Sequence, residues 1–393
     1  MTGFAPTVES RPIVGRGPMT ARVDLAGEQD PGDGVRLEEL GITEAARECS
    51  ADWNGFRRRA QLTPFLAPDY LATWAGAMGL TDDCRVVIAR RYGELVGYGP
   101  FMIRDEPFGP LSVPTLRFIG HNIGFPGDVL YSDVAATGAS PAIIRAILKR
   151  VSRWRFLRWD LGFVPHTSQT QASASFILGR PSGGTPVEAK PYVGLSLPRT
   201  WDAYLQGLSG NTRGNFRRRL HRLEEQGEVH VTIASAREPV RGTVREMVRN
   251  HRRWWEGTER GAWFGDERVE RLLLDGAALL AAQGRFLAFA LELDGEPIAW
   301  NVGAYDGPRY FEQYISFNRA FADCSPGVLL GILIVRNLIE LGATRVELGP
   351  GVNERKRSLG GVPCAYDHLR GARGWLRALT TLHEVLRGRG GLA

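Results

Sequence analysis

Residues 285–349 contain the pattern that decides the fold. They include Arg285-Phe-Leu-Ala-Phe-Ala290, Asp294-Gly-Glu-Pro-Ile-Ala299, Ser325-Pro-Gly-Val-Leu-Leu-Gly-Ile-Leu333 and Arg345-Val-Glu-Leu-Gly349. The first two runs predict strands joined by a tight turn, and the Ser-Pro start predicts a helix that leads to a final strand. This order is typical of a mixed α/β domain in which a helix crosses over to a parallel strand.

The same order of elements occurs a second time, roughly 185 to 202 residues earlier, a separation that suits whole domains. The earlier runs are Arg85-Val-Val-Ile-Ala-Arg90, Gly93-Glu-Leu-Val-Gly97, Ser140-Pro-Ala-Ile-Ile-Arg-Ala-Ile-Leu148 and Arg158-Trp-Asp-Leu-Gly162. We therefore predict an α/β (mixed α+β) protein of two tandem domains, each a mostly antiparallel sheet flanked by helices. The expected divisions are a flexible tail (1–34), a first domain (35–195), a second domain that opens with a basic helix (196–386) and a short tail (387–393).

Composition narrows the class of protein. The 393 residues are 43% hydrophobic and 23% charged, and no apolar run is long enough to cross a membrane. The four cysteines form no CxxC pair, and no secretory signal opens the chain, so we expect a cytoplasmic protein without disulfides. The net charge of +6 comes from a basic set with only three lysines, so we give it little weight as a sign of nucleic-acid binding.

Several chemistries lack their usual motifs. The chain has no GxxxxGK[ST] phosphate loop, no GxGxxG, no GxSxG and no HExxH. Nucleotide hydrolysis, dinucleotide-dependent redox chemistry and α/β-hydrolase chemistry are therefore disfavoured, and we expect no metal site.

The helix start at Ser325-Pro326-Gly327 is the first candidate binding site. Free N–H groups of Gly327, Val328 and Leu329 would point at an anion, and Gly327 would let a phosphate come close. The alternative is a helix start without a ligand.

The strand 310–317 is the candidate catalytic element. An alternation of period two would place Tyr310, Glu312, Tyr314 and Ser316 on one face. Glu312 is then a candidate general base for an amine, and Tyr314 a candidate proton donor to a leaving group. The alternative is the solvent-facing side of an antiparallel sheet.

Two basic segments complete the set of candidates. After the strand that ends at Gly349, the residues Asn353, Arg355 and Lys356 are placed to reach a carboxylate or phosphate. The arginine-rich helix 211–226 carries Arg218 and Arg222, and Trp254 lies in the next helical run. Interleaved basic and aromatic residues can bind substrate or RNA, whereas the alternative is a solvated surface helix.

These features together resemble the GNAT acyltransferase superfamily, in particular its double-domain branch of CelD-like acetyltransferases and FemAB-like aminoacyl transferases. The resemblance covers roughly residues 50–370 and rests on the duplication, the Ser325-Pro-Gly helix start, the strand ending at Glu347-Leu-Gly349 and the basic helix. It implies that Ser325, Gly327 and Val328 hold the pyrophosphate of the donor and that Lys356 is the basic residue after the last core strand. The sequence departs from the pattern in its short Ser-Pro-Gly run and in Arg355, which stands where a tyrosine is usual.

Three functions follow as expectations. The first is an N-acyltransferase that moves an acyl group, with acetyl expected, from acyl-CoA to a small-molecule amine, amino sugar or peptide by direct attack. The second is a transferase that takes an aminoacyl group from tRNA and forms an amide bond. The third is a non-catalytic binding protein that keeps the fold.

Overall fold

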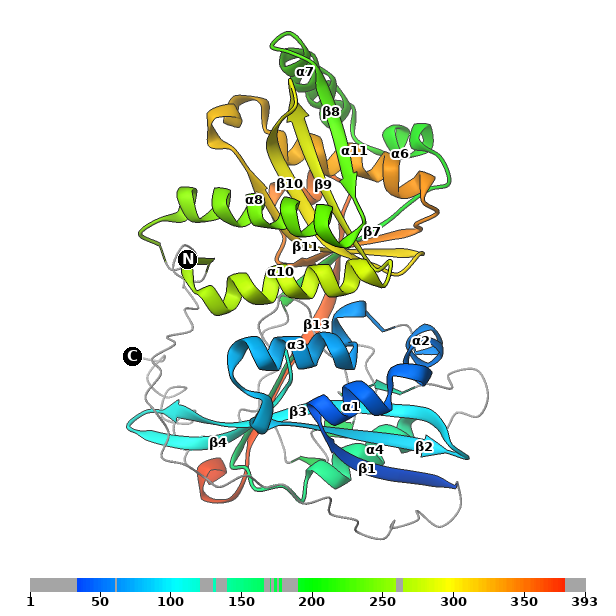
Figure 1. Cartoon of the computed structure of the whole chain (residues 1–393), viewed down its shortest axis with the longest axis vertical. Coiled ribbons are helices and arrows are strands. Elements are labelled where there is room, and N and C mark those ends of the chain that lie inside the picture. Colours follow the sequence, from blue (N-terminus) through cyan, green and yellow to red (C-terminus); the bar gives the residue numbers. More distant parts are fainter. Residues whose placement is uncertain are drawn as a thin grey trace, which may run out of the picture.

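The computed structural model describes residues 34–60, 62–120, 130–131, 140–165, 170, 173–174, 177–178, 190–258 and 264–378. Two bodies are stacked along the long axis of the molecule, and strand β13 (Val362–Ala372) runs from one to the other (Figure 1). The first copy comprises the elements from β1 to β6, and the second those from β7 to α12. Apart from Gly34, the two predicted tails lie outside the described residues.

The first copy begins with the edge strand of its sheet, which three α-helices follow. Its elements are β1 (Val35–Gly41), α1 (Ile42–Glu48), α2 (Ser50–Arg59), η1 (Pro64–Leu66), α3 (Pro68–Met78), η2 (Thr81–Asp83), β2 (Cys84–Arg91), β3 (Glu94–Phe108), β4 (Leu111–Phe118), β5 (Leu130–Tyr131), α4 (Ser140–Val151) and β6 (Arg158–Pro165). The predicted turn between β2 and β3 is confirmed, since Tyr92 and Gly93 both have positive φ angles. Such angles match the right-handed twist of the flanking strands.

The second copy repeats this plan and adds two helices at its start. Its elements are β7 (Lys190–Ser196), α6 (Trp201–Gly207), α7 (Gly210–Glu224), β8 (Val229–Ala234), α8 (Arg237–Trp255), α10 (Glu267–Ala282), β9 (Phe286–Leu293), β10 (Glu296–Tyr305), β11 (Arg309–Phe317), η3 (Arg319–Cys324), α11 (Pro326–Glu340), β12 (Arg345–Pro350) and α12 (Glu354–Ser358). Asp294 and Gly295 form the predicted turn between β9 and β10, again with positive φ.

The strand orders confirm the duplication. The first copy has the order β1-β2-β3-β4-β6, and the second has β8-β9-β10-β11-β12. In each copy the last pair (β4 with β6, β11 with β12) is parallel and is connected through the Ser-Pro helix, while the other pairs are antiparallel. The predicted fold class, two tandem GNAT-like domains with mixed and mostly antiparallel sheets, is therefore correct.

Strands are exchanged between the two copies. β7 follows the first copy in the sequence but pairs with β12, whereas β13 follows the second copy and pairs with β6. β7 and β13 also pair with each other, so the two expected sheets are joined into one of 13 strands. The division at 195/196 stays a prediction, and it falls inside β7, before the last residue of that strand.

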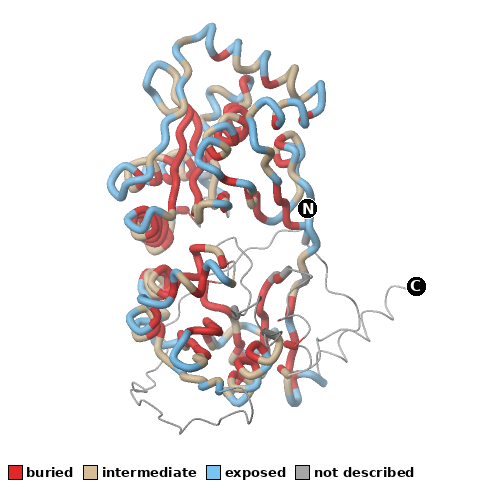
Figure 2. The backbone as a smooth tube through the Cα atoms, turned by 90° about the vertical axis from the view of Figure 1, so that its right-hand side faces the viewer, coloured by how far each residue is buried: buried red, intermediate tan, exposed pale blue. Residues whose placement is uncertain are grey.

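Three large apolar clusters hold the molecule together, and buried segments run through both copies (Figure 2). One cluster packs α4 onto the first sheet, and a second packs α11 onto the sheet of the second copy. The third is shared, because α1 to α3 of the first copy pack with α8 and α10 of the second. Gly276 in α10 permits the closest approach, since a Cβ there would lie 2.8 Å from the ring of Tyr70 in α3.

Within the described residues, no helix combines the length and the apolar character that a membrane span requires.

Candidate active site

The parallel pair β11–β12 stops pairing early. Its register covers Arg309 with Arg345, Tyr310 with Val346, and Phe311 with Glu347. Both strands continue beyond this point, to Phe317 and Pro350, without being paired to each other. The carboxyl end of a parallel pair, next to the crossover helix, is where α/β proteins commonly place ligands.

A β-bulge in β11 corrects the predicted face of this strand. Gly303 of β10 pairs with Glu312 and Val302 pairs with Tyr314, so Gln313 is the extra residue. Gly303 is needed here because a Cβ at that position would lie 2.1 Å from the carbonyl oxygen of Phe311. The extra residue reverses the alternation beyond it.

The side chains predicted to share a face of β11 are therefore separated. Tyr310 packs in the apolar cluster around α11, and Glu312 is hydrogen-bonded to Tyr310's partner Asn301. Tyr314 instead contacts the ring of Phe264, and Ser316 contacts α8. The prediction of one shared polar face is wrong, because the bulge turns Tyr314 and Ser316 to the opposite side of the sheet.

A buried polar network lies where β11 and β12 stop pairing. The hydroxyl of Tyr310 donates to Asn301 Oδ1 at 2.8 Å, and Asn301 Nδ2 donates to Glu312 Oε2 at 2.7 Å. Arg355, which begins α12 with Glu354, donates to both carboxylate oxygens of Glu312, to Oε2 at 3.1 Å. Burial raises the pKa of Tyr310 well above its usual range, and the charge of Glu312 adds to the shift.

The network assigns Glu312 a different role from the predicted one. Its side chain is 5% exposed and that of Arg355 is 15% exposed. Gly331 in α11 lets the helix that carries Arg355 pack closely, since a Cβ there would lie 3.1 Å from Cδ2 of Leu359, which follows α12. A carboxylate with both oxygens engaged is better suited to hold the guanidinium in place than to accept a proton from an amine.

Lys356 and Asn353 shape the chain after β12. Lys356 Nζ donates to the carbonyl oxygens of Gly349, Pro350 and Gly351 at 2.9, 2.7 and 3.0 Å. Asn353 caps α12, where its Oδ1 accepts from the N–H of Lys356. Lys356 and Asn353, which were both predicted to contact a ligand, therefore bind backbone groups of the protein itself. Burial lowers the pKa of Lys356 to about 8, and the charge of Glu312 opposes this shift.

The start of α11 also differs from the expectation. Ser325 precedes the helix and Pro326 opens it, as predicted, but Ser325 has a left-handed backbone (φ 49°) and makes no side-chain cap. The N–H groups of Val328 and Leu329 donate to the carbonyl of Ser325 at 2.9 and 3.1 Å. Two of the three N–H groups expected to bind an anion are therefore engaged.

Gly327 lies against the end of β11. A Cβ at Gly327 would lie 3.4 Å from Phe317 and 3.6 Å from Ile315. Both distances are ordinary van der Waals contacts, so a methyl group fits at Gly327 and the packing of α11 on β11 does not require glycine there.

Trp254 belongs to a chain of hydrogen bonds with a defined direction. The indole N–H can only donate, and it donates to Asn250 Oδ1 at 3.0 Å. Asn250 Nδ2 in turn donates to Ser316 Oγ at 2.7 Å, and Ser316 Oγ lies 2.9 Å from His251 Nδ1. Ser316 thus links the side chains of Asn250 and His251. Two guanidinium groups also lie near the ring of Trp254. The Cζ atoms of Arg253 and Arg319 are 5.7 and 5.6 Å from its centroid.

The predicted arginine helix exists as α7. Arg218 and Arg222 are both exposed, and Arg218 donates to Asn215 Oδ1 at 2.5 Å. α7 packs against η3 and α11 at the end of the second copy that lies farthest from the first copy (Figure 1). Arg218 and Arg222 therefore lie far in space from the polar residues between the two copies.

Sequence reasoning missed a row of polar side chains on the strands that join the two copies. Tyr192 of β7 and Tyr366 of β13 have ring centroids 4.6 Å apart. Next to them, His368 Nε2 lies 2.8 Å from Asp160 Oδ1 of β6. Burial raises the pKa of Tyr192 well above its usual range, with Glu347 and Tyr366 adding to the shift. No periodicity signals this row, because strand exchange between distant segments creates it.

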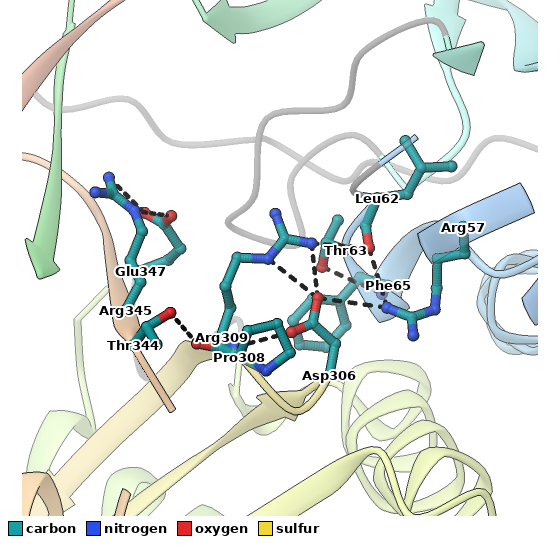
Figure 3. Close-up of polar contacts among 10 residues, drawn as sticks. All are labelled: Arg57, Leu62, Thr63, Phe65, Asp306, Pro308, Arg309, Thr344, Arg345 and Glu347. Carbon is teal, nitrogen blue, oxygen red and sulfur yellow. Dashed lines mark hydrogen bonds and ion pairs between the residues drawn. The ribbon is translucent and has the colours of Figure 1, made fainter. Parts of the chain in front are cut away.

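An ion-pair cluster anchors the second copy to the first (Figure 3). Asp306, in the turn between β10 and β11, binds Arg309 at 2.6 Å and Arg57 of α2 at 3.4 Å. Arg57 and Asp306 are each 3% exposed, and burial lowers the pKa of Arg57 to about 10. Because Arg309 begins β11, this cluster fixes the start of the strand that carries Glu312.

Comparisons with known proteins agree with this geometry. Residues 210–357 match the family described as Acetyltransferase (GNAT) domain. No curated protein is significantly similar in sequence. The crystal structure of FemX has a TM-score of 0.58 at 12% identity, over 89% of this chain and 100% of that chain. The C-terminal domain (DUF2156) of a putative lysylphosphatidylglycerol synthetase from Agrobacterium fabrum has a TM-score of 0.51 at 11% identity, over 87% and 96%.

The second copy is thus a GNAT domain by sequence, and the first copy has the same strand order. The chain therefore contains a GNAT acetyltransferase domain at residues 210–357, and this domain supports an acyltransferase. Because the identity is so low, the similarity to these solved structures shows the fold alone, and it does so for both copies.

Proposed function

We propose that the protein is an N-acyltransferase that moves an acyl group, acetyl in the simplest case, from acyl-CoA to an amine. The observation that supports this most is the early end of the β11–β12 ladder after Phe311 and Glu347. Beyond it the two strands present backbone edges that are not paired with each other, and these suit an extended donor arm that carries amide groups. Backbone N–H groups at such a point also suit the oxyanion of acyl transfer.

The reaction is a direct transfer. The amine nitrogen attacks the thioester carbon and forms the C–N bond, the C–S bond of the tetrahedral intermediate breaks, and the CoA thiolate takes up a proton. Such a reaction depends on positioning more than on a protein nucleophile. We assign Glu312 the role of holding Arg355 beside the reacting groups, rather than that of a base.

Of the two candidate proton donors, Tyr192 is preferred, because the bulge turns Tyr314 to the side of the sheet opposite Glu312 and Arg355. Tyr314 is half-buried on the α8 side of β11, and Tyr192 lies buried on β7 close to Glu347. A phenol whose pKa is raised keeps its proton at neutral pH, so Tyr192 is suited to donate a hydrogen bond to a developing negative charge.

We place the acceptor between the two copies. The row formed by Tyr192, Tyr366 and the Asp160–His368 pair offers aromatic faces and hydrogen-bonding groups on one side of the joined sheet. These groups fit a small-molecule amine, an amino sugar or a peptide amine.

Titration with acetyl-CoA tests the proposal. A donor that binds the folded protein at about 100 times its dissociation constant adds about 2.7 kcal/mol to the free energy of unfolding, which raises Tm by several degrees. A saturable rise with acetyl-CoA, together with release of free CoA in the presence of an amine, is the expected result. No rise at millimolar acetyl-CoA would exclude this donor.

Transfer of an aminoacyl group from tRNA is the second candidate, and the exposed arginines of α7 favour it. Arg217, Arg218 and Arg222 lie on the surface, and no salt bridge to them occurs within the described residues. This function requires activity that ribonuclease abolishes, and binding whose logarithm falls steeply with the logarithm of salt concentration. Amide formation that survives ribonuclease treatment would exclude it.

A further inference from the structure

Arg309 and Arg345 lie opposite each other at the start of the parallel pair β11–β12, where they are register partners. The next residues, Tyr310 and Val346, are buried in the apolar cluster around α11. Because side chains alternate between the two faces of a sheet, the two arginines belong to the opposite face. Phe311, which shares that face with them, packs in the apolar cluster that both copies form. Arg309 and Arg345 therefore face the first copy.

Both guanidinium groups extend toward the point where the ladder ends. Cζ of Arg309 lies 4.9 Å from the ring centroid of Phe311, and Nε of Arg345 donates to Glu347 Oε1 at 2.5 Å. Phe311 and Glu347 form the last pair of the ladder. Gly194 of β7 leaves the space that the guanidinium of Arg345 occupies, since a Cβ there would lie 2.8 Å from Arg345 Cζ. Two cations thus lie beside the place where we propose the reaction.

The charges around Arg309 do not balance (Figure 3). Asp306 Oδ2 accepts from Arg309 Nη2 at 2.6 Å and Nε at 3.1 Å, and also from Arg57 Nη1 at 3.4 Å. One carboxylate therefore serves two guanidinium groups, while Glu347 serves Arg345 alone. No other salt bridge to these five side chains occurs in the part of the chain that the structure describes, so the set carries one excess positive charge. Such an excess attracts an anion.

Two nitrogens of this cluster have no hydrogen-bond acceptor among the described residues. Arg309 donates through Nε and Nη2, and its Nη1 donates to no atom. Nε of Arg57 is buried and also has no partner. Buried donors almost always have a partner, so the cluster lacks an acceptor group. The side chains of Arg309 and Arg345 are 21% and 35% exposed, so a ligand can reach them.

We propose that Arg309, with Arg345 as a second cation beside it, binds a carboxylate of the acceptor, so that the acceptor is an amino acid or a peptide rather than a simple amine or an amino sugar. This inference rests on the proposed function. The carboxylate accepts a hydrogen bond from Nη1 of Arg309, and the acceptor amine lies beyond Phe311 and Glu347, where the ladder has ended. One excess positive charge matches a carboxylate, whereas a phosphate monoester carries nearly two negative charges.

Three pairs of acceptors test this proposal. L-lysine, L-ornithine and glycylglycine are each compared with their own carboxamide, which keeps the amines and loses only the carboxylate. At least one acid is expected to bind the wild-type protein about 10–100-fold more tightly than its amide, because the amide cannot form the charge-assisted hydrogen bond. Calorimetry measures both dissociation constants.

Variants of the two arginines assign this preference. Arg309→Gln leaves Asp306 paired with Arg57, and the preference for the acid is expected to fall to about twofold or less. Arg309→Lys keeps the ion pair with Asp306 but lacks the planar fork, so it is expected to lose most of the preference too, and it replaces Arg309→Gln if that variant does not fold. Arg345→Gln/Glu347→Gln removes the second cation together with its partner and is expected to weaken the preference about fivefold.

A matched control lies on the helices α8 and α10. Arg241 and Asp275 form an ion pair at 3.0 Å, with side chains that are 32% and 39% exposed, so Arg241 is about as accessible as Arg345. Arg241→Gln/Asp275→Asn removes this pair away from the ladder of β11 and β12. It is expected to change the dissociation constants of acid and amide by no more than about twofold.

The outcomes separate this inference from the proposed function. If no acid binds more tightly than its amide, or if the Arg309 variants weaken acid and amide equally, the inference is wrong. An equal loss of preference in the control also overturns it. Release of CoA from acetyl-CoA measures the proposed function separately, and equal release with acids and amides leaves that function standing without the carboxylate site. Binding that prefers the acid and depends on Arg309, without any release of CoA, supports the carboxylate site and overturns the proposed function.

Discussion

The two copies share a strand order and differ at the point where their parallel strands stop pairing. In the first copy the ladder of β4 and β6 ends at Leu116 with Trp159, and the next residue of β4 is Arg117. In the second copy the ladder ends at Phe311 with Glu347, and the next residue of β11 is Glu312. Equivalent positions thus carry a half-buried cation in one copy and a buried anion in the other.

The partners of these two residues come from different places. Arg117 is bound by Glu106 of β3 and by Asp160 of β6, which is also hydrogen-bonded to His368 of β13. All four residues belong to strands of the same sheet. Glu312 is bound instead by Arg355 of α12, a short helix that follows β12. In the first copy, the partners of this charged residue all come from the sheet. In the second copy, the partner of Glu312 comes from a segment outside the sheet, and for this reason we place the reaction in the second copy.

The largest expected effect comes from removing the cation of the second copy. Arg355→Met leaves Glu312 buried without its partner, so the free energy of unfolding in urea is expected to fall by about 3–5 kcal/mol. Replacing both residues, as in Glu312→Leu/Arg355→Met, removes the unpaired charge and is expected to recover most of that loss while activity stays low.

The matched change in the first copy tests the comparison. Arg117→Met leaves Asp160 with His368 and the N–H of Gly162 as partners. A smaller loss of about 1–3 kcal/mol is expected, with kcat retained in the remaining folded protein. If Arg117→Met abolished activity in folded protein while Arg355→Met preserved it, the assignment of the reaction to the second copy would be wrong.

An intermediate effect that depends on pH is expected at Lys356. Its pKa is lowered by burial to about 8, below the value in the unfolded chain, so between about pH 8 and pH 10 the unfolded protein binds more protons. The stability of the wild-type protein relative to Lys356→Met should therefore rise as the pH increases through this range. Urea denaturation of both proteins at pH 7 and pH 10 measures the difference, and a relative fall would show that the ammonium form is the favoured one.

The smallest effect concerns Gly327, whose equivalent in the first copy is Ala142. A methyl group at Gly327 would contact Phe317 at 3.4 Å, which is ordinary van der Waals distance. Gly327→Ala is therefore expected to stabilise α11 by up to about 1 kcal/mol, measured as a small rise in Tm. A fall in affinity for acetyl-CoA in the same variant would support a close approach of the donor to Gly327, and unchanged affinity would exclude such an approach.

Local signals in the sequence predicted the elements well. The Asp294-Gly295 turn and the Ser325-Pro326 helix start mark real boundaries, because turn and cap chemistry acts between neighbours in the chain. The duplicated order of strands and helices followed from these boundaries, and with it the parallel pair in each copy.

Features that depend on contacts between distant residues could not be predicted from such local signals. The bulge at Gln313 reversed the face of Tyr314 because the backbone oxygen of Phe311 lies against Gly303, ten residues earlier in the chain than Gln313. The rarity of lysine predicts a ligand contact for Lys356, but its ammonium donates to the carbonyl groups of Gly349, Pro350 and Gly351. Asn353 could have been recognised from sequence as a helix cap, since asparagine before a short helical run is a common start.

The strand exchange has a consequence for how the protein is made. The sheet of the first copy is completed by β13, which begins roughly 200 residues after β6 ends. At a synthesis rate of about 5–20 residues per second, the nascent first copy waits about 10–40 s on the ribosome with one strand of its sheet missing. The edge of β6 is exposed during that interval, so this protein folds late rather than copy by copy, and its yield in a cell should depend on chaperones that shield unpaired strand edges.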